Sequence, residues 1–99
     1  MNIDTLSKKS VTMRRDKLKI LVGILEICDG DGANKTKIVY GSNINFKVAD
    51  VYLDMLIKEN LMEVIAPGPR EVYHTTAKGK ELIENIKDIY DRIEKYTLE

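Results

Sequence analysis

Two short segments of the sequence carry residue types that hold metal ions or phosphate in other proteins. Asp29-Gly30-Asp31-Gly32 has the alternating carboxylates with which a calcium-binding loop begins. Such a loop needs glycine at its sixth position and a chelating glutamate at its twelfth, where this chain has Asn34 and Tyr40. Asn34-Lys35-Thr36 has the order that ends a phosphate-binding loop, but Asp29 and Asn34 stand in place of its two glycines. We therefore expect neither a calcium site nor a nucleotide site in this turn.

The residue types needed for catalysis are too few to form a site. The chain has one histidine, His74, and one cysteine, Cys28, so an internal disulfide or a cysteine-based zinc site cannot form. Cys28 closes an apolar helical pattern, which is typical of a core residue. We expect no catalytic residue, no metal, no cofactor and no small-molecule substrate, and therefore no enzymatic activity.

The composition is that of one globular domain. The 99 residues are 43% hydrophobic and 32% charged, and they are too few to hold a second, cofactor-binding domain. The N-terminal segment has no apolar run typical of a signal peptide, and no stretch reaches the roughly 18–20 apolar residues of a membrane span. This predicts a cytoplasmic protein with no membrane partner.

Hydrophobic spacing predicts a first helix over residues 16–28, with Asp16 as its N-cap. Residues 1–15 before it are polar and are expected to form a flexible arm. The apolar side chains of the helix recur at spacings of three and four residues, which places them on one buried face. These residues are Leu18, Leu21, Leu25 and Cys28.

Two further helices are predicted by their cap residues. A short helix over 35–40 is opened by Asn34, whose side chain can accept a hydrogen bond from the first turn. A longer one over 46–59 has Asn45 as its N-cap, and Asn60 suits the left-handed residue that ends it. Two short β runs follow at 62–66 and 71–75, and the Pro-Gly-Pro-Arg segment between them predicts a hairpin with a rigid tip.

The last segment, residues 76–99, has the most regular pattern in the chain. Apolar residues alternate at spacings of four and three, which is the heptad repeat of a coiled coil, and charged residues lie between them. Part of this seam is expected to pack on the chain's own domain and the rest on a second copy, although a helix folded back onto a monomer is the alternative. The residues predicted for the dimer interface are Leu82, Ile86, Ile89, Tyr90, Ile93 and Tyr96.

This order of elements predicts an α+β, mainly α fold. Three helices, a two-stranded β wing and a closing helix are typical of a winged helix-turn-helix, here with a long C-terminal coiled-coil helix. We divide the chain into a flexible arm over 1–15, a DNA-binding domain over 16–76 and a dimerisation helix over 77–99.

Several stretches of the chain also resemble a known family. They are ILEICDG, NKTKIVYGSNINF and YLDMLIKENLME, all between Leu21 and Glu63, and the step from Tyr73 to Gly79 after the wing. They are similar to the small archaeal ten-kilodalton winged-helix DNA-binding proteins. The resemblance implies a homodimer held by an antiparallel coiled coil of the last helices, which binds duplex DNA without catalysis. The neutral charge of this chain argues against DNA packaging more than against DNA binding.

The positive charge lies mainly in the first part of the chain. The net charge is zero, but residues 1–41 carry eight basic and five acidic side chains. The second helix of a helix-turn-helix abuts the DNA backbone, so its first residues are candidates for phosphate contacts, together with the arginines of the arm. The predicted contacts are Lys35, Thr36, Lys37, Arg14 and Arg15.

The third helix and the turn before it are expected to read bases. Asparagine pairs well with adenine, lysine with guanine, and aspartate with cytosine. The candidates are Asn43, Asn45, Phe46, Lys47 and Asp50, with Arg70 on the wing. Asp50 and Asp54 oppose the phosphates, and they motivate the alternative, a winged-helix module that binds proteins and assembles through its coiled coil.

Overall fold

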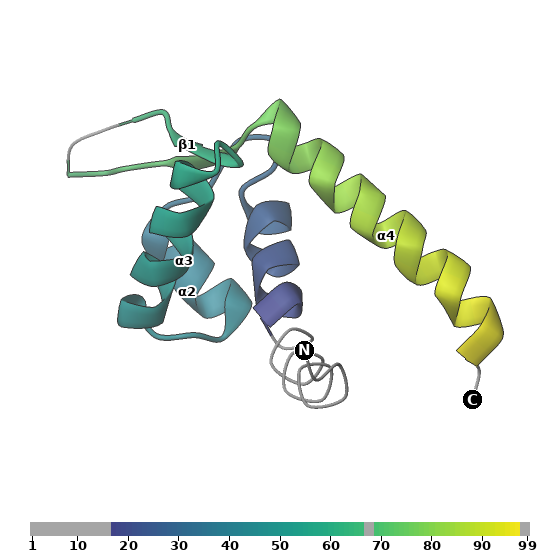
Figure 1. The fold of residues 1–99 in the computed structure, drawn as a ribbon. Helices are drawn as coiled ribbons and strands as arrows, with labels where there is room; N and C mark the ends of the chain where they lie inside the picture. The colour runs from purple at the N-terminus through teal and green to yellow at the C-terminus, as the bar shows by residue number, and fades with distance from the viewer. Residues whose placement is uncertain (1–16, 67–68, 98–99) are drawn as a thin grey trace, which may run out of the picture.

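The computed structural model describes residues 17–66 and 69–97, and it has the predicted fold (Figure 1). The first helix is described from residue 17 to residue 27. It is followed by α2 (Lys35–Ser42), α3 (Phe46–Lys58), β1 (Met62–Val64), β2 (Tyr73–Thr75) and α4 (Ala77–Thr97). The predicted arm, its Arg14 and Arg15, the Asp16 cap and the middle of the hairpin tip lie outside the described residues.

Asparagine side chains begin both helices of the helix-turn-helix, as predicted. The Oδ1 atom of Asn34 accepts a hydrogen bond from the Lys37 N–H at 2.9 Å, and that of Asn45 accepts one from the Val48 N–H at 2.8 Å. The prediction that α2 ends at residue 40 was wrong by two residues. The helix continues to Ser42 because Asn43, with a φ of 56°, supplies the left-handed residue that ends it.

The end of α3 follows the same rule. Asn60 has a φ of 63°, which confirms the predicted left-handed residue. This conformation lets the Leu61 N–H bond the Leu56 carbonyl at 2.9 Å, so the chain turns back toward the core. The buried side of α3 consists of Ala49, Leu53 and Leu56.

The wing is shorter than predicted. Each strand has three residues instead of five, paired as Met62 with Thr75, Glu63 with His74 and Val64 with Tyr73. One further bond joins the Ile65 N–H to the Val72 carbonyl at 2.9 Å, after which the chain bends.

The glycine-rich turn after the first helix has a structural role. Gly30 and Gly32 both have positive φ values, and a Cβ on Gly32 would lie 2.8 Å from the Tyr73 carbonyl oxygen. This close approach allows Ala33 to bridge Tyr73, with N–H to O distances of 2.9 and 2.8 Å. The turn therefore joins the helical part of the domain to the wing.

The core lies between the first helix, α3 and the wing. Its buried apolar residues include Ile24, Leu25, Cys28, Ile38, Leu53, Leu56, Met62, Tyr73 and Ile83. Thr75 is buried among them, and its hydroxyl donates a 2.6 Å hydrogen bond to the Leu25 carbonyl. Burial raises the pKa of the Cys28 thiol from 9.0 to about 12, because the charged thiolate has little solvation there.

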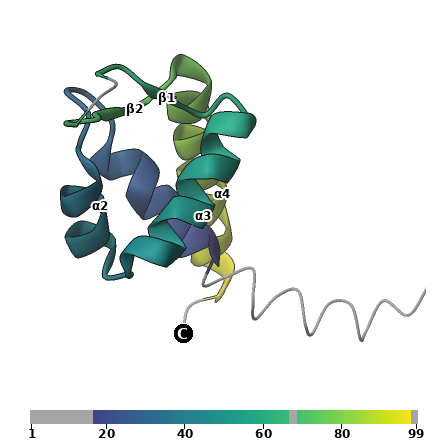
Figure 2. The ribbon, with the colours of Figure 1, turned by 90° about the vertical axis from the view of Figure 1, so that its left-hand side faces the viewer.

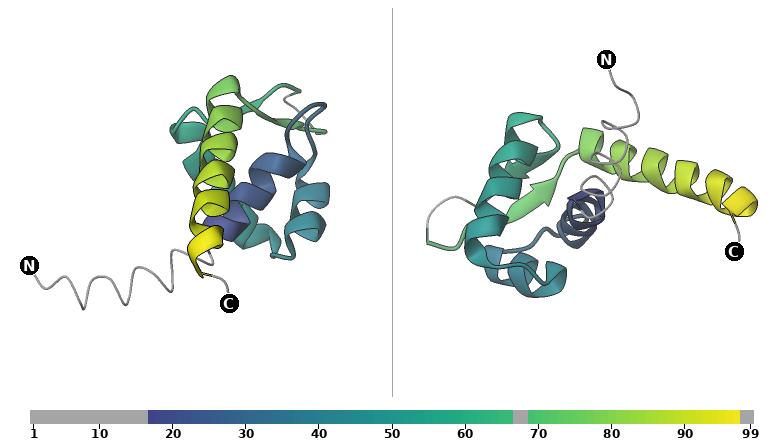
Figure 3. Two further views of the ribbon diagram at one scale, coloured as in Figure 1. Left: turned by 90° about the vertical axis from the view of Figure 1, so that its right-hand side faces the viewer. Right: turned by 60° about the horizontal axis from the view of Figure 1, so that its bottom comes forward.

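Helix α4 begins against the wing and then leaves the body of the domain. Thr76 caps it, since its Oγ1 accepts the Gly79 N–H at 3.1 Å. A Cβ on Gly79 would clash with the Leu61 carbonyl, so only glycine lets the helix start this close to the backbone. Figures 1 and 3 show the first helix between α4 and the α2–α3 pair. None of the described helices is both long and apolar enough to cross a lipid bilayer.

Candidate nucleic-acid interface

The exposed face of α3 is the surface that a helix-turn-helix presents to its target. Figure 2 shows α2 and α3 on the viewer's side and α4 behind them. Residues three or four apart lie on one face of a helix, and the exposed residues of α3 follow this spacing. We call this set the recognition face; it consists of Lys47, Asp50, Val51, Asp54 and Lys58.

An ion pair joins this face to the start of α2. The Nζ atom of Lys35 lies 2.5 Å from Oδ1 of Asp50, and both side chains remain partly exposed. Lys35, a predicted phosphate contact, is therefore ion-paired with Asp50, a predicted base contact. The pair cancels two charges at the centre of the helix-turn-helix, and the exposed acid of Asp54 is left beside Lys47 and Lys58.

A second feature is a polar hollow of about 310 Å³ between the start of α2 and the wing, which we call the α2–wing hollow. It brings together Lys35, Thr36 and Arg70, three of the residues predicted to contact DNA. The remaining residues that line it are Asn34, Pro69, Glu71 and Tyr73. Because the backbone N–H groups at a helix start carry partial positive charge, this position favours an anion.

Glu71, which lines the α2–wing hollow, accepts a hydrogen bond from a neighbouring hydroxyl. Tyr73 donates a 2.7 Å hydrogen bond to Oε1 of Glu71. Burial of the phenol, together with the bond to Glu71 and its negative charge, raises the pKa of Tyr73 well above its ordinary value. The phenol therefore stays protonated and engages the carboxylate of Glu71, the residue that follows Arg70 in the chain.

The predicted base-reading residues do not all have free side chains. Asn43 supplies the left-handed end of α2, and the Oδ1 of Asn45 is already used in capping α3. Phe46 and Lys47 are exposed at the start of α3, and Asp50 is exposed but ion-paired. Lys37 is exposed on α2.

The heptad seam of α4 divides into a covered part and an open part. Ile83 is buried and Leu82 and Ile86 are half-buried, so the first heptad packs on the domain. The open part is exposed from residue 89 onward and consists of Ile89, Tyr90, Ile93 and Tyr96.

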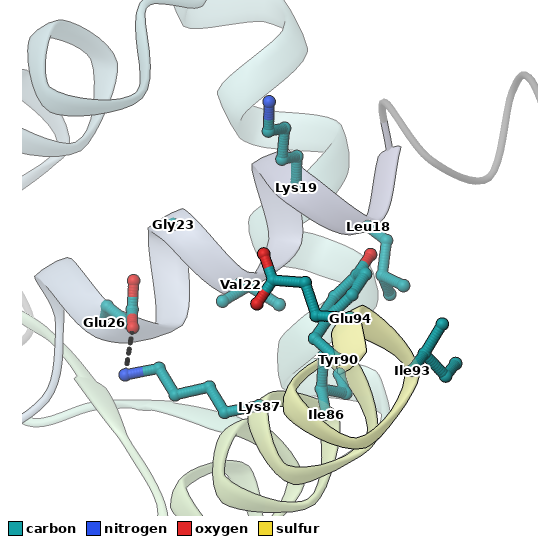
Figure 4. Close-up of a pocket in the computed structure, with 10 residues that line it drawn as sticks. All are labelled: Leu18, Lys19, Val22, Gly23, Glu26, Ile86, Lys87, Tyr90, Ile93 and Glu94. Atoms are coloured by element: carbon teal, nitrogen blue, oxygen red, sulfur yellow. Dashed lines mark ion pairs between the residues drawn. The ribbon is translucent and has the colours of Figure 1, made fainter. Parts of the chain in front are cut away.

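A largely apolar groove of about 590 Å³ runs between the open part of the seam and the first helix (Figure 4). Leu18 and Val22 of the first helix lie on one side, and Ile86, Tyr90 and Ile93 lie on the other. The Nζ atom of Lys87 lies 2.6 Å from Oε2 of Glu26 and joins the two helices. This hydrogen bond to Glu26 raises the pKa of Lys87.

Comparison with known proteins identifies this arrangement. The profile of the winged helix-turn-helix family matches residues 14–94, which is most of the chain. The chain belongs to the winged helix-turn-helix family. Its α3 corresponds to the helix that this fold places toward DNA, and its hairpin is the wing.

Individual relatives agree with this membership. The chain is similar to the crystal structure of Sso10a-2, a DNA-binding protein from Sulfolobus solfataricus, with 32% identity and a TM-score of 0.63 over 79% of this chain and 84% of that one. An uncharacterized protein of Methanocaldococcus jannaschii is 29% identical over 79 residues, or 80% of this chain. The match spans only 36% of the length of that relative. The resemblance to small archaeal winged-helix DNA-binding proteins is confirmed.

A more distant neighbour shares the fold. It is the homodimeric winged helix-turn-helix DNA-binding domain of Mb0332 from Mycobacterium bovis, described as a possible ArsR-family transcriptional regulator. The TM-score is 0.62 and the identity 15%, over 83% of this chain and 84% of that one. The winged helix of our chain is therefore an architecture found in bacteria as well as archaea.

Two exposed residues of the winged helix were not among the predicted contacts. Val51 has 65% of its surface exposed at the middle of the recognition face, and Tyr40 has 77% exposed on α2. Helical spacing already places Val51 away from the core, and that signal was sufficient to find it. Tyr40 follows Thr36 by four residues and shares its side of α2, so it also belongs to the candidate interface.

The structure offers no alternative metal chemistry in the part of the winged helix that it describes. Over residues 17–66 and 69–97, no three His, Cys, Asp or Glu side chains lie close enough together to hold an ion. His74, the only histidine, is engaged at 2.9 Å with Oε2 of Glu63 on the wing.

Proposed function

We propose that this protein is a homodimeric reader of duplex DNA in the cytoplasm, acting as a transcriptional regulator or as a nucleoid-associated protein without catalysis. The α2–wing hollow is the observation that carries the proposal. It gathers Lys35, Thr36 and Arg70 beside the recognition face, at a helix start that favours anions. A phosphate held there would fix the position of α3 in the major groove.

The electrostatics favour selective over indiscriminate binding. The recognition face carries two lysines and two aspartates, and Lys35 is tied to Asp50. Non-specific affinity comes mainly from uncompensated basic groups near phosphate, and few are present here. We therefore propose that Lys37, Arg70, Thr36 and the arm residues Arg14 and Arg15 provide the backbone contacts. Bases would be contacted by Phe46, Lys47 and the asparagines Asn43 and Asn45.

Dimerisation follows from the open seam of α4. Ile89, Ile93 and Tyr96 lie in heptad register and stay exposed on a helix that leaves the domain. Apolar side chains of this size are stabilised by burial, and a second α4 offers the same pattern. We propose residues 77–99 as the dimerisation helix, 16–76 as the DNA-binding domain and 1–15 as an arm.

The test is a titration of a labelled mixed-sequence duplex at several salt concentrations. Binding should weaken with salt, with a slope of about 0.9 per phosphate neutralised. Lys37→Ala and Arg70→Ala should weaken binding to all sequences, and each substitution should lower the slope by about 0.9 because it removes one cation from the backbone. Lys80→Ala is the matched control, because Lys80 is an exposed lysine on α4 that belongs neither to the recognition face nor to the α2–wing hollow.

A protein-binding module is the second candidate. It is favoured by the exposed Val51 and Met55, which place apolar surface on the recognition face and its edge. Under this alternative the wild-type protein fails to bind duplex DNA even at low salt. Lys37→Ala then leaves function intact, and disruption of the seam with Ile89→Asp abolishes it.

A further inference from the structure

Val51 is an apolar residue at the centre of a charged surface. It has 65% of its surface exposed, and no core residue covers it. Lys47 precedes it by four residues, Asp54 follows it by three, and both are exposed on the same side of α3. A β-branched side chain has little freedom about χ1 in a helix, so its methyl groups hold a fixed position.

The charges around Val51 determine which ligand suits it. Asp50, the preceding residue, is paired with Lys35, so the unpaired charges of the recognition face are Lys47 and Lys58 against Asp54. These groups flank Val51, whose own side chain offers neither a charge nor a hydrogen-bond donor. Among the base edges in the major groove, the C5 methyl of thymine is the group that an apolar side chain recognises.

We infer that Val51 contacts the methyl group of a thymine and sets a preference for thymine at one position of the DNA site. This inference rests on the proposed function, since it requires α3 to enter the major groove. Lys47 and Asp54 flank the contact and can reach the neighbouring base pairs. Asp50 then acts on Lys35 and not on the base opposite Val51.

The experiment begins with selection of duplexes from a random library by the wild-type protein. Each thymine of the enriched site is then replaced by deoxyuridine, which removes only the methyl group. One replacement should weaken wild-type binding about fourfold, the effect of exposing one buried methyl. The variant Val51→Ala should bind the thymine duplex about fourfold more weakly and bind the thymine and uracil duplexes equally.

The matched control is Val48→Ala, the same chemical change on a half-buried residue of α3. It should leave the thymine-to-uracil ratio at the wild-type value even where it weakens binding overall. If a site is enriched but the ratio of affinities for the thymine and uracil duplexes is the same for Val51→Ala and the wild type, the contact assigned to Val51 is wrong and the proposed function still stands. Absence of any enrichment overturns the proposed function and this contact with it, and would indicate that Val51 faces a protein.

Discussion

Lys35 at the start of α2 and Asp50 in the middle of α3 form a 2.5 Å ion pair, although they lie fifteen positions apart in the sequence. The pair links the two helices of the helix-turn-helix through side chains that both face the proposed DNA. Lys35 also lines the α2–wing hollow, so the same ammonium group adjoins both parts of the interface. While the pair is intact, Asp50 partly neutralises the charge that Lys35 would offer to a phosphate.

We therefore predict that Asp50→Asn tightens binding to mixed-sequence DNA. The exposed pair is worth about 0.2–1 kcal/mol, which corresponds to a gain of roughly 1.4- to fivefold at low salt. Lys35→Ala in the Asp50→Asn background should remove the gain, which a double-mutant cycle at constant salt will measure. Asp54→Asn is the control, since it removes an acid from the same face without releasing Lys35. The effect of each substitution on affinity is compared in the wild-type and Lys35→Ala backgrounds. If the effect of Asp50→Asn is the same in both backgrounds, as that of Asp54→Asn should be, the pair does not restrain Lys35.

The open seam of α4 predicts a dimer that a single charge disrupts. Ile93→Asp should give a monomer in light scattering at micromolar concentration, because a carboxylate in an apolar seam has no partner. Ile65→Asp on the wing is the control, since Ile65 is 52% exposed and Ile93 is 50% exposed. A dimer that survives Ile93→Asp but not Ile65→Asp would move the interface from α4 to the wing.

Two helical glycines should respond to alanine in opposite directions. Gly79→Ala places a methyl group on the Leu61 carbonyl and 2.7 Å from Cγ2 of Thr75, so we expect a loss of about 1–3 kcal/mol in unfolding free energy. Gly23→Ala meets no atom within 4 Å and should stabilise the helix by about 0.5–1 kcal/mol. Urea unfolding of both variants will test this, and a neutral Gly79→Ala would mean that α4 can shift away from the wing.

Cys28 predicts how stability depends on alkaline pH. Its pKa is raised from 9.0 to about 12 in the folded protein, so folding keeps the proton bound where the unfolded chain would release it. The contribution to stability is complete below pH 9 and is lost as the pH rises toward 12. Between pH 8 and 10 the unfolding free energy should fall by roughly 1 kcal/mol.

Cys28→Ala separates this effect from other titrations. The variant is expected to be less stable at every pH, because it leaves a void in the core. Its stability should fall less than that of the wild type between pH 8 and 10, where the raised pKa of Tyr73 still contributes. The thiol of the wild-type protein should also react with Ellman's reagent only at the rate of unfolding. Fast labelling of the native protein at neutral pH would contradict the burial of Cys28.

The features that the sequence predicted well are local. Asn34, Asn45 and Asn60 act within one helical turn of their own position, and the structure confirms each of them. The apolar spacing of α3 likewise predicts its buried side, because helical geometry relates spacing to position directly. These local signals also predicted the order of elements and the winged helix-turn-helix fold, and the family resemblance agreed with them.

The features that escaped prediction depend on long-range contacts. The bridge from Ala33 to Tyr73 joins segments far apart in the chain, and no spacing rule indicates it. The pairing of Lys35 with Asp50 could not be predicted from spacing, because it depends on the angle between α2 and α3. Ile83 was not among the residues predicted for the seam, but it is buried, because the first heptad packs inward.

The close approach at Gly79 fixes the direction in which α4 leaves the domain. Its direction is set by backbone contact with Leu61 and by the Lys87–Glu26 pair, so the helix cannot pivot freely on the domain. In a dimer joined through α4, the length of that helix fixes the distance between the two recognition faces. One added heptad lengthens it by about 10 Å, close to three base pairs of duplex. The spacing of half-sites can therefore change with helix length while every residue that touches a base stays the same.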